Sequence, residues 1–419
     1  MTPTIKFNPQ LCAMSENSLD LAQRNLVLAF LPYLGSPLSG LEVSRKASRL
    51  VSEALEALQG PLGPWRLLWG PGTFQAVPGA VPANTMFVAE HGRTGELFIS
   101  IAGTNPYSPY AWFAEDFHVD ETSDWVYGSG GKRGAISMGT LTGLRALQGM
   151  VPPRQVPGAN LSLTRFLEGY FNKRRKAVPV TVAGHSLGGA LAPAAALWLL
   201  DTQADWDARL RAEISVYAYA GPSPGDAVFA DYIEKRFGDR LHRIYNPKDV
   251  VTHAWDVADL SELKALYSPE LMRDPLWDRA VDFLITASKG IDYKQIDSSP
   301  VELAGRIKQE IVFRLAPPIA NLVGQLLYQH TLAYFELLEV AFPEKRSALG
   351  RRLSQQSGML ARQILSRAGV WSPVSMLGGL LVKAFTETWS HMPMAPSPIP
   401  EVGPQPGDTA GEAAELSTA

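Results

Sequence analysis

The fold is decided by residues 180–190, which read VTVAGHSLGGA. The segment starts as an apolar run of strand length, passes through a G-x-S-x-G pattern and continues as small, helix-forming residues. Gly184 and Gly188 leave room for the backbone at a tight strand-to-helix turn, where a serine hydroxyl is exposed. The alternative is a chance G-x-S-x-G in a structural turn. Because the flanking pattern matches the nucleophile turn on both sides, we expect Ser186 to be a nucleophile.

Strands and helices alternate on both sides of this turn. A hairpin is predicted over residues 85–102, followed by helices around 141–150 and over 161–176. The pattern then predicts strands over 178–183, 214–220 and 240–245, separated by helices that end near 200 and that span 226–237. Alternation of this kind predicts an α/β fold, in which helices flank a central, mostly parallel sheet.

The rest of the chain suggests three parts. Residues 1–258 are predicted to hold an N-terminal segment and the catalytic core, including a long loop over 103–134 with many aromatic residues. Residues 259–390 are dominated by helical patterns broken by prolines and predict a helical insert or cap. Residues 391–419 are rich in Pro, Gly, Ala and acidic residues, and we expect a disordered tail there.

Composition excludes several classes of function. The 419 residues carry 38 basic and 41 acidic side chains, a net charge of −3, so no global positive field favours nucleic acid. Cys12 is the only cysteine, which rules out an intrachain disulfide and a thiol metal cluster. No apolar stretch approaches transmembrane length, and the first 13 residues lack a secretory signal pattern. We expect a soluble protein, either cytoplasmic or secreted without a recognisable signal peptide.

At this point the sequence resembles a known family. The segment around Ser186 is similar to the nucleophile turn of the class-three, fungal-type lipases, which are α/β hydrolases acting on acylglycerols. Residues 100–116 resemble that family's oxyanion strand and the tryptophan and aspartate that follow it, and residues 220–226 and 243–251 resemble its glycine-x-proline turn and acid-bearing strand end. One departure is Ala102, which stands where the family has arginine, so what that cation braces must be held otherwise here. The spacing leaves Glu115 or Asp116 as the family's aspartate, with Asp116 favoured.

The remaining site residues follow from chain order and from this resemblance. Asp249 comes just after an apolar strand, where a carboxylate can orient a histidine, although a turn aspartate is the alternative. The N–H of Leu187, next after the nucleophile, is one expected oxyanion donor. The resemblance assigns the second donor to Thr104. We expect neither a metal nor an organic cofactor.

The base must follow the acid in the chain order typical of this fold. His253 lies on the same loop as Asp249, and His391 lies at the edge of the expected tail. His330 precedes a tyrosine-phenylalanine pair, as in the family, and is the predicted base. Its alternative is a core histidine, because it continues an apolar helical face from Ile319.

Together these residues predict a serine hydrolase that cleaves carboxylic esters, and the resemblance implies a lipase that forms an acyl-enzyme on Ser186. The expected partner is an ester or lipid substrate, which could be presented at a lipid–water interface. A phospholipase or a short-chain esterase on the same fold is the first alternative. An inactive lipase-like binding protein is the second. Aromatic residues of the loop could line an acyl pocket or a lid, or could equally be ordinary core: Tyr107, Tyr110, Trp112, Phe113 and Phe117.

Overall fold

A seven-stranded sheet organises the molecule in the order β1-β2-β3-β6-β7-β8-β9. This computed structural model describes residues 16–105, 108, 115–116, 118–296, 300–312, 314 and 316–340. The strands of the sheet are β1 (Trp65–Phe74), β2 (Asn84–His91), β3 (Leu97–Ile101), β6 (Val178–His185), β7 (Ala212–Tyr219), β8 (Leu241–Tyr245) and β9 (Val301–Glu302). Strands β1 to β3 are antiparallel, and β3, β6, β7, β8 and β9 pair in parallel. A separate antiparallel pair joins β4 (Thr122–Asp124) to β5 (Ala135–Ser137).

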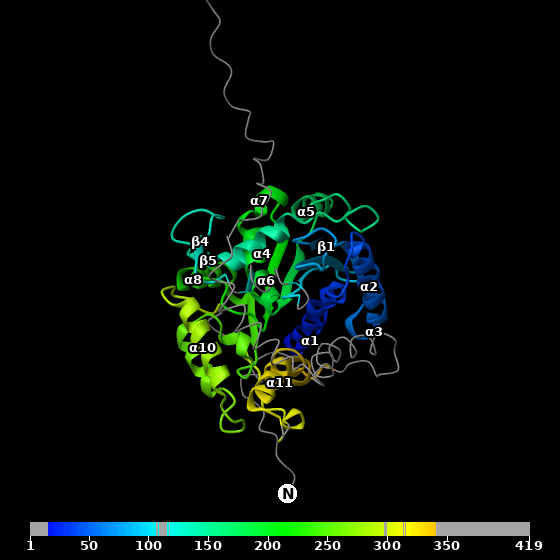
Figure 1. Ribbon diagram of the computed structural model, residues 1–419. Coiled ribbons are helices and arrows are strands. Elements are labelled where there is room, and N and C mark those ends of the chain that lie inside the picture. Colours follow the sequence, from blue (N-terminus) through cyan, green and yellow to red (C-terminus); the bar gives the residue numbers. More distant parts are fainter. Residues whose placement is uncertain are drawn as a thin grey trace, which may run out of the picture.

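Helices cover both faces of this sheet. The α-helices are α1 (Glu16–Phe30), α2 (Val43–Ala57), α3 (Gln59–Leu62), α4 (Met138–Gln148), α5 (Leu163–Phe171), α6 (Leu187–Asp201), α7 (Gln203–Trp206), α8 (Ala227–Phe237), α9 (Val257–Glu262), α10 (Pro275–Ser288), α11 (Pro318–His330) and α12 (Leu332–Leu337). Short 3-10 helices are η2 (Leu31–Gly35), η4 (Gly238–Arg240), η5 (Val250–His253), η6 (Leu263–Ala265) and η7 (Gln309–Ile311). In Figure 1, α1 and α2 lie to one side of the sheet, while α10 and α11 lie in the lower part of the view, away from α5 and α7.

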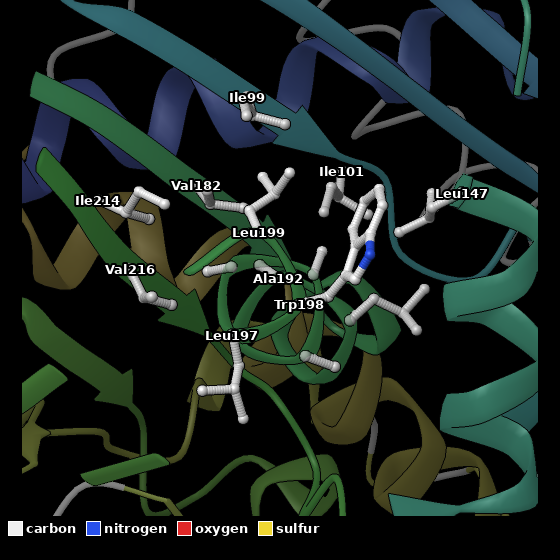
Figure 2. Packing of buried hydrophobic residues seen from close by; sticks show 14 of the residues in the cluster. Ile99, Ile101, Leu147, Val182, Ala192, Leu197, Trp198, Leu199, Ile214 and Val216 are labelled. Carbon is white, nitrogen blue, oxygen red and sulfur yellow. The ribbon is translucent and has the colours of Figure 1, made fainter. Parts of the chain in front are cut away.

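The alternation of side chains along the strands divides the interior into two cores. Val182 belongs to a core that includes α4, α5, α6 and α8, whereas the next residue, Ala183, belongs to a core with α1, α2 and α12. Successive strand residues point to opposite faces, so this division follows from the strand period. Figure 2 shows the first core, where Leu197, Trp198 and Leu199 of α6 lie among apolar residues of the strands.

Helix α6 is buried along most of its length. Its residues from Leu187 to Leu199 are all buried, including Pro193 within the helix. A helix that is apolar all round must lie inside the protein, which fits its position against β6 and β7. The helix therefore fixes the turn at Ser186 from the core outward.

A third apolar cluster, called here the cap cluster, lies around α9, α10 and α11. It comprises Val119, Val250, Ala254, Trp255, Leu260, Leu263, Tyr267, Leu271, Trp277, Val281, Tyr293 and Leu322. This cluster is distinct from both sheet cores and also includes residues that precede α9. The division of the chain into three parts remains a prediction.

Several elements differ from the prediction. The sequence was expected to be almost wholly helical after residue 259, yet Val301 and Glu302 form β9 and pair with β8. Four helical elements and β1 precede the first predicted strand, and α1 and η2 include the mostly apolar residues 26–34. The helices beyond residue 340, the tail and the five aromatic residues of the long loop lie outside the described residues. Among the described helices, none combines the length and apolar composition needed to span a membrane.

Candidate active site

Ser186 occupies the sharp turn between β6 and α6. Its backbone has φ 64° and ψ −131°, a conformation that non-glycine residues rarely adopt. A Cβ added to Gly184 would lie 2.2 Å from the carbonyl oxygen of Gly188, and one added to Gly188 would lie 2.5 Å from that of Ile101. Contacts this close exclude any side chain, which explains both glycines of the G-x-S-x-G pattern.

The structure brings Ser186, His330 and Asp249 together in one hydrogen-bonded chain. Nδ1 of His330 lies 2.9 and 3.0 Å from the two carboxylate oxygens of Asp249. A carboxylate only accepts, so Nδ1 carries the proton and Nε2 is left as an acceptor. Nε2 lies 2.8 Å from Oγ of Ser186, which donates to it. This is the geometry that a general base needs toward a hydroxyl nucleophile.

The parallel sheet explains why these residues meet. Ser186 follows β6 and Asp249 follows β8, and the carboxyl ends of parallel strands lie at one edge of a sheet. His330 is the last residue of α11 and reaches this edge from a different part of the chain. Its side chain is 14% exposed, while that of Asp249 is fully buried.

Asp249 is held by further donors. The hydroxyl of Tyr334 donates to its Oδ2 at 2.9 Å, and the N–H of Val251 donates to its Oδ1 at 3.0 Å. The N–H of Asn246 in turn donates to the hydroxyl of Tyr334 at 3.1 Å. Tyr334 was part of the family resemblance but was not predicted as a site residue. Its position four residues after His330 is the signal in the sequence that points to it.

The competing histidines lie elsewhere or in the surroundings of the site. Nε2 of His253 is hydrogen-bonded to the carbonyl oxygen of Pro247 at 3.0 Å. His391 lies outside the described residues. His185, next to the serine, is buried, and its Nε2 is 2.7 Å from the backbone carbonyl of His330.

Both predicted oxyanion donors lie on backbone segments next to the serine, Leu187 directly after it and Thr104 directly after Gly103. Leu187 is the first residue of α6, so its N–H has no carbonyl acceptor within the helix. Thr104 follows β3, one residue after Gly103, where an added Cβ would lie 2.8 Å from Cβ of Ser186. The hydroxyl of Thr104 donates to both oxygens of Asp116, at 2.9 and 2.8 Å. The contact with Thr104 favours Asp116 over Glu115 as the counterpart of the family's aspartate.

Glu115 has a different partner. It accepts a hydrogen bond from the side-chain amide of Asn84 at 2.7 Å. Burial raises the pKa of Glu115 to about 8 and that of Asp116 to about 7, although the Thr104 hydrogen bond lowers the latter. The two adjacent carboxyl groups therefore accept hydrogen bonds from different neighbours.

A mostly parallel sheet that presents a serine on a strand-to-helix turn to a histidine and a carboxylate has the α/β-hydrolase architecture. Similarity to known proteins identifies a family within the α/β hydrolases. A family model described as Lipase (class 3) matches residues 98–257. The crystal structure of M37 lipase is 32% identical in sequence, and the similarity covers 78% of this chain and 93% of that chain with a TM-score of 0.67. The chain belongs to the class 3 lipase family.

Two curated relatives match a shorter part. The secreted mono- and diacylglycerol lipase MDL2 of Malassezia globosa is 33% identical over 84 residues, 19% of this chain and 25% of the relative. Phospholipase A1-Igamma1, chloroplastic, of Arabidopsis thaliana is 33% identical over 88 residues, 21% of this chain and 17% of the relative. The matches span a quarter or less of the length of these two relatives.

Proposed function

We propose that this protein is a carboxylic ester hydrolase of the lipase type that acts on acylglycerols. The observation that carries the proposal is the hydrogen-bonded chain from Oγ of Ser186 through His330 to Asp249. The similarity to M37 lipase over 93% of that chain supports the same assignment.

In the proposed reaction, His330 removes the proton from Ser186 as its Oγ attacks the ester carbonyl carbon. Asp249 orients the imidazole and stabilises its charged form. The N–H groups of Leu187 and Thr104 stabilise the negative charge on the former carbonyl oxygen. His330 then protonates the leaving alcohol, which gives an acyl-enzyme. Water hydrolyses this intermediate, releases the fatty acid and restores Ser186.

The substrate class is proposed on the same basis. Fatty acyl esters of glycerol are poorly soluble, so we propose that the enzyme meets them at a lipid–water interface. We also propose that the helical segment after residue 258 acts as a cap, since it supplies His330 and most residues of the cap cluster. Phospholipase A1 activity is the second candidate, favoured by the Arabidopsis relative.

The first test combines active-site labelling with point variants. A fluorophosphonate probe should label folded wild-type protein and should not label Ser186→Ala. Ser186→Ala and His330→Ala should each lower kcat for ester hydrolysis by roughly 10³-fold or more, because members of such a unit act together. His253→Ala is the matched control and should keep near-wild-type activity, since its ring contacts Pro247 instead.

Two results would overturn the assignment. Folded wild-type protein that resists the probe would favour an inactive binding protein. Near-full activity of His330→Ala would exclude His330 as the base. The substrate class is tested by comparing emulsified triacylglycerol, diacylglycerol, phosphatidylcholine and soluble short-chain esters, and a preference for phosphatidylcholine would replace the acylglycerol assignment by phospholipase activity.

A further inference from the structure

Tyr33 joins the two halves of the candidate active site through its hydroxyl group. It lies in η2, far from the other site residues in sequence. Its hydroxyl oxygen accepts the N–H of Gly103 at 3.0 Å, directly before Thr104. The same hydroxyl lies 3.2 Å from both Nδ1 and the carbonyl oxygen of His185, directly before Ser186.

The protonation of His185 follows from its partners. Its Nε2 lies 2.7 Å from the carbonyl oxygen of His330, and a carbonyl can only accept, so Nε2 carries the proton. Nδ1 is then an acceptor for the hydroxyl of Tyr33. Burial lowers the pKa of His185 well below its ordinary value, and the nearby His330 lowers it further, which keeps the ring neutral.

These bonds form one continuous connection across the site. It runs from the N–H of Gly103 to Tyr33, from Tyr33 to His185, and from His185 to the backbone of His330. Phe30 packs on the His185 ring, with centroids 4.4 Å apart, so the N-terminal segment also holds this ring by contact. Both the oxyanion turn and the backbone of the base are therefore hydrogen-bonded to the pair formed by Tyr33 and His185.

We propose that Tyr33 is a positioning residue that holds the Gly103–Thr104 backbone in the geometry of an oxyanion hole. The inference rests on the proposed function. The apolar side chain of Ala102 cannot hold this turn by a hydrogen bond. Tyr33, in the N-terminal segment, holds the backbone of the turn instead, through the N–H of Gly103. The segment lies outside residues 98–257, the part matched by the family model.

The space around Gly103 strengthens this assignment. A Cβ added there would lie 2.2 Å from the hydroxyl oxygen of Tyr33 and 2.3 Å from the carbonyl oxygen of His185. Only glycine permits so close an approach of the turn to the tyrosine. Small displacements of an oxyanion donor weaken its interaction with the transition state, because the donor must be preorganised.

The test is Tyr33→Phe, which removes the hydroxyl and keeps the ring. We expect kcat for an oxoester to fall by at least about 10-fold with little change in KM, because the donors act mainly in the transition state. Hydrolysis of the matched thionoester, whose sulfur makes weaker hydrogen bonds, should fall less. The ratio of oxoester to thionoester rates should therefore drop.

Tyr219→Phe is the matched control. Tyr219 is buried, and its hydroxyl likewise connects the N-terminal segment to the rest of the protein, because it donates to the carbonyl oxygen of Ala22 at 2.6 Å. Tyr219→Phe should leave the ratio of oxoester to thionoester hydrolysis rates unchanged. A thermal unfolding curve for each variant shows whether it is folded, and so distinguishes the effect of losing the hydroxyl from the effect of unfolding.

A second readout does not depend on activity. The amide of Gly103 should exchange with solvent deuterium faster in Tyr33→Phe than in wild type, and at the wild-type rate in Tyr219→Phe. Unchanged rate ratio and unchanged exchange in Tyr33→Phe would overturn the inference. Wild-type protein that hydrolyses no ester would overturn the proposed function alone, and exchange at Gly103 would then decide whether Tyr33 braces the turn.

Discussion

Glu115 and Asp116 are adjacent carboxyl groups near the turn that carries Thr104, and Glu115 is buried while Asp116 is half-buried. Desolvation is the main cause of their raised pKa values, of about 8 and about 7, and for Glu115 the charge of its neighbour adds to it. In the folded protein both groups therefore bind protons at pH values where the unfolded chain has released them. Folding is linked to proton uptake at these two residues.

This linkage predicts a stability that decreases with rising pH. The contribution of Asp116 to the free energy of unfolding is unaffected below its ordinary pKa of 3.8 and falls as pH rises toward about 7. Asp116→Asn should remove this part of the decrease, so its stability relative to wild type should rise between pH 5 and pH 8. Urea unfolding at both pH values measures the difference.

The control for this prediction is Asp124→Asn, at an exposed carboxylate on β4. It should follow the pH dependence of the wild type. If the free energy of unfolding of Asp116→Asn changed with pH as much as that of the wild type, Asp116 would not take up a proton on folding.

Single site residues could be predicted from the sequence where the neighbouring residues form a recognisable pattern. Ser186 lies in a strand-to-helix pattern, and Asp249 and His330 follow it in a fixed order. Tyr33 could not be selected, because its partner Gly103 lies 70 residues away and no spacing connects them. Its surroundings in the sequence predict only an apolar segment.

Helix α6 illustrates how an element constrains its residues. A Cβ added to Gly189 would lie 2.5 Å from the carbonyl oxygen of Tyr219 and 2.8 Å from Cα of Gly221. Gly189→Ala should therefore lower the free energy of unfolding by roughly 1–3 kcal/mol, as overpacking of a core does. Chemical denaturation gives the value directly.

A second glycine supplies the opposite expectation. Gly169 lies within α5, and an added Cβ would meet nothing within 4 Å. Gly169→Ala should raise the free energy of unfolding by about 0.5–1 kcal/mol, because alanine loses less backbone entropy in a helix. Equal effects of the two substitutions would show that packing at Gly189 is looser than these distances imply.

Elements with a clear period were predictable, and short ones were not. The alternation of strands and helices from residue 85 to 245 predicts the order and type of the core elements. Strand β9 has two residues, too few to show any alternation, and follows Pro300 in a region with helical patterns. Pairing with β8 forms this strand, and local sequence does not encode that pairing.

On the scale of the whole molecule, the N-terminal helices complete one of the two cores. Leu26 and Leu31 lie in the same cluster as Phe87 and Phe98 of the sheet and Tyr334 of α12. The residues matched by the family model thus form only part of the packing unit. We therefore expect the sheet to need the packing of α1 and η2, which also positions the contacts of Tyr33 with the site.

Removal of residues 1–42 should therefore prevent normal folding. The truncated chain would expose the apolar face of the sheet that α1 and η2 cover, including Phe87 and Phe98. We expect a dye that binds exposed apolar surface to fluoresce with the truncated chain, and cooperative thermal unfolding to be lost. A truncated chain that unfolds cooperatively and keeps esterase activity would contradict this view.

The position of α12 also has a consequence for synthesis on the ribosome. Phe335 contacts Phe30 with ring centroids 4.7 Å apart, and Tyr334 donates to Asp249. Segments far apart in the chain thus close around Asp249. A nascent chain that has already exposed Ser186 and Asp249 would still lack both the base and the tyrosine that holds the acid. The proposed hydrolysis could therefore not begin until α12 has been translated, so an unfinished chain would not hydrolyse lipid.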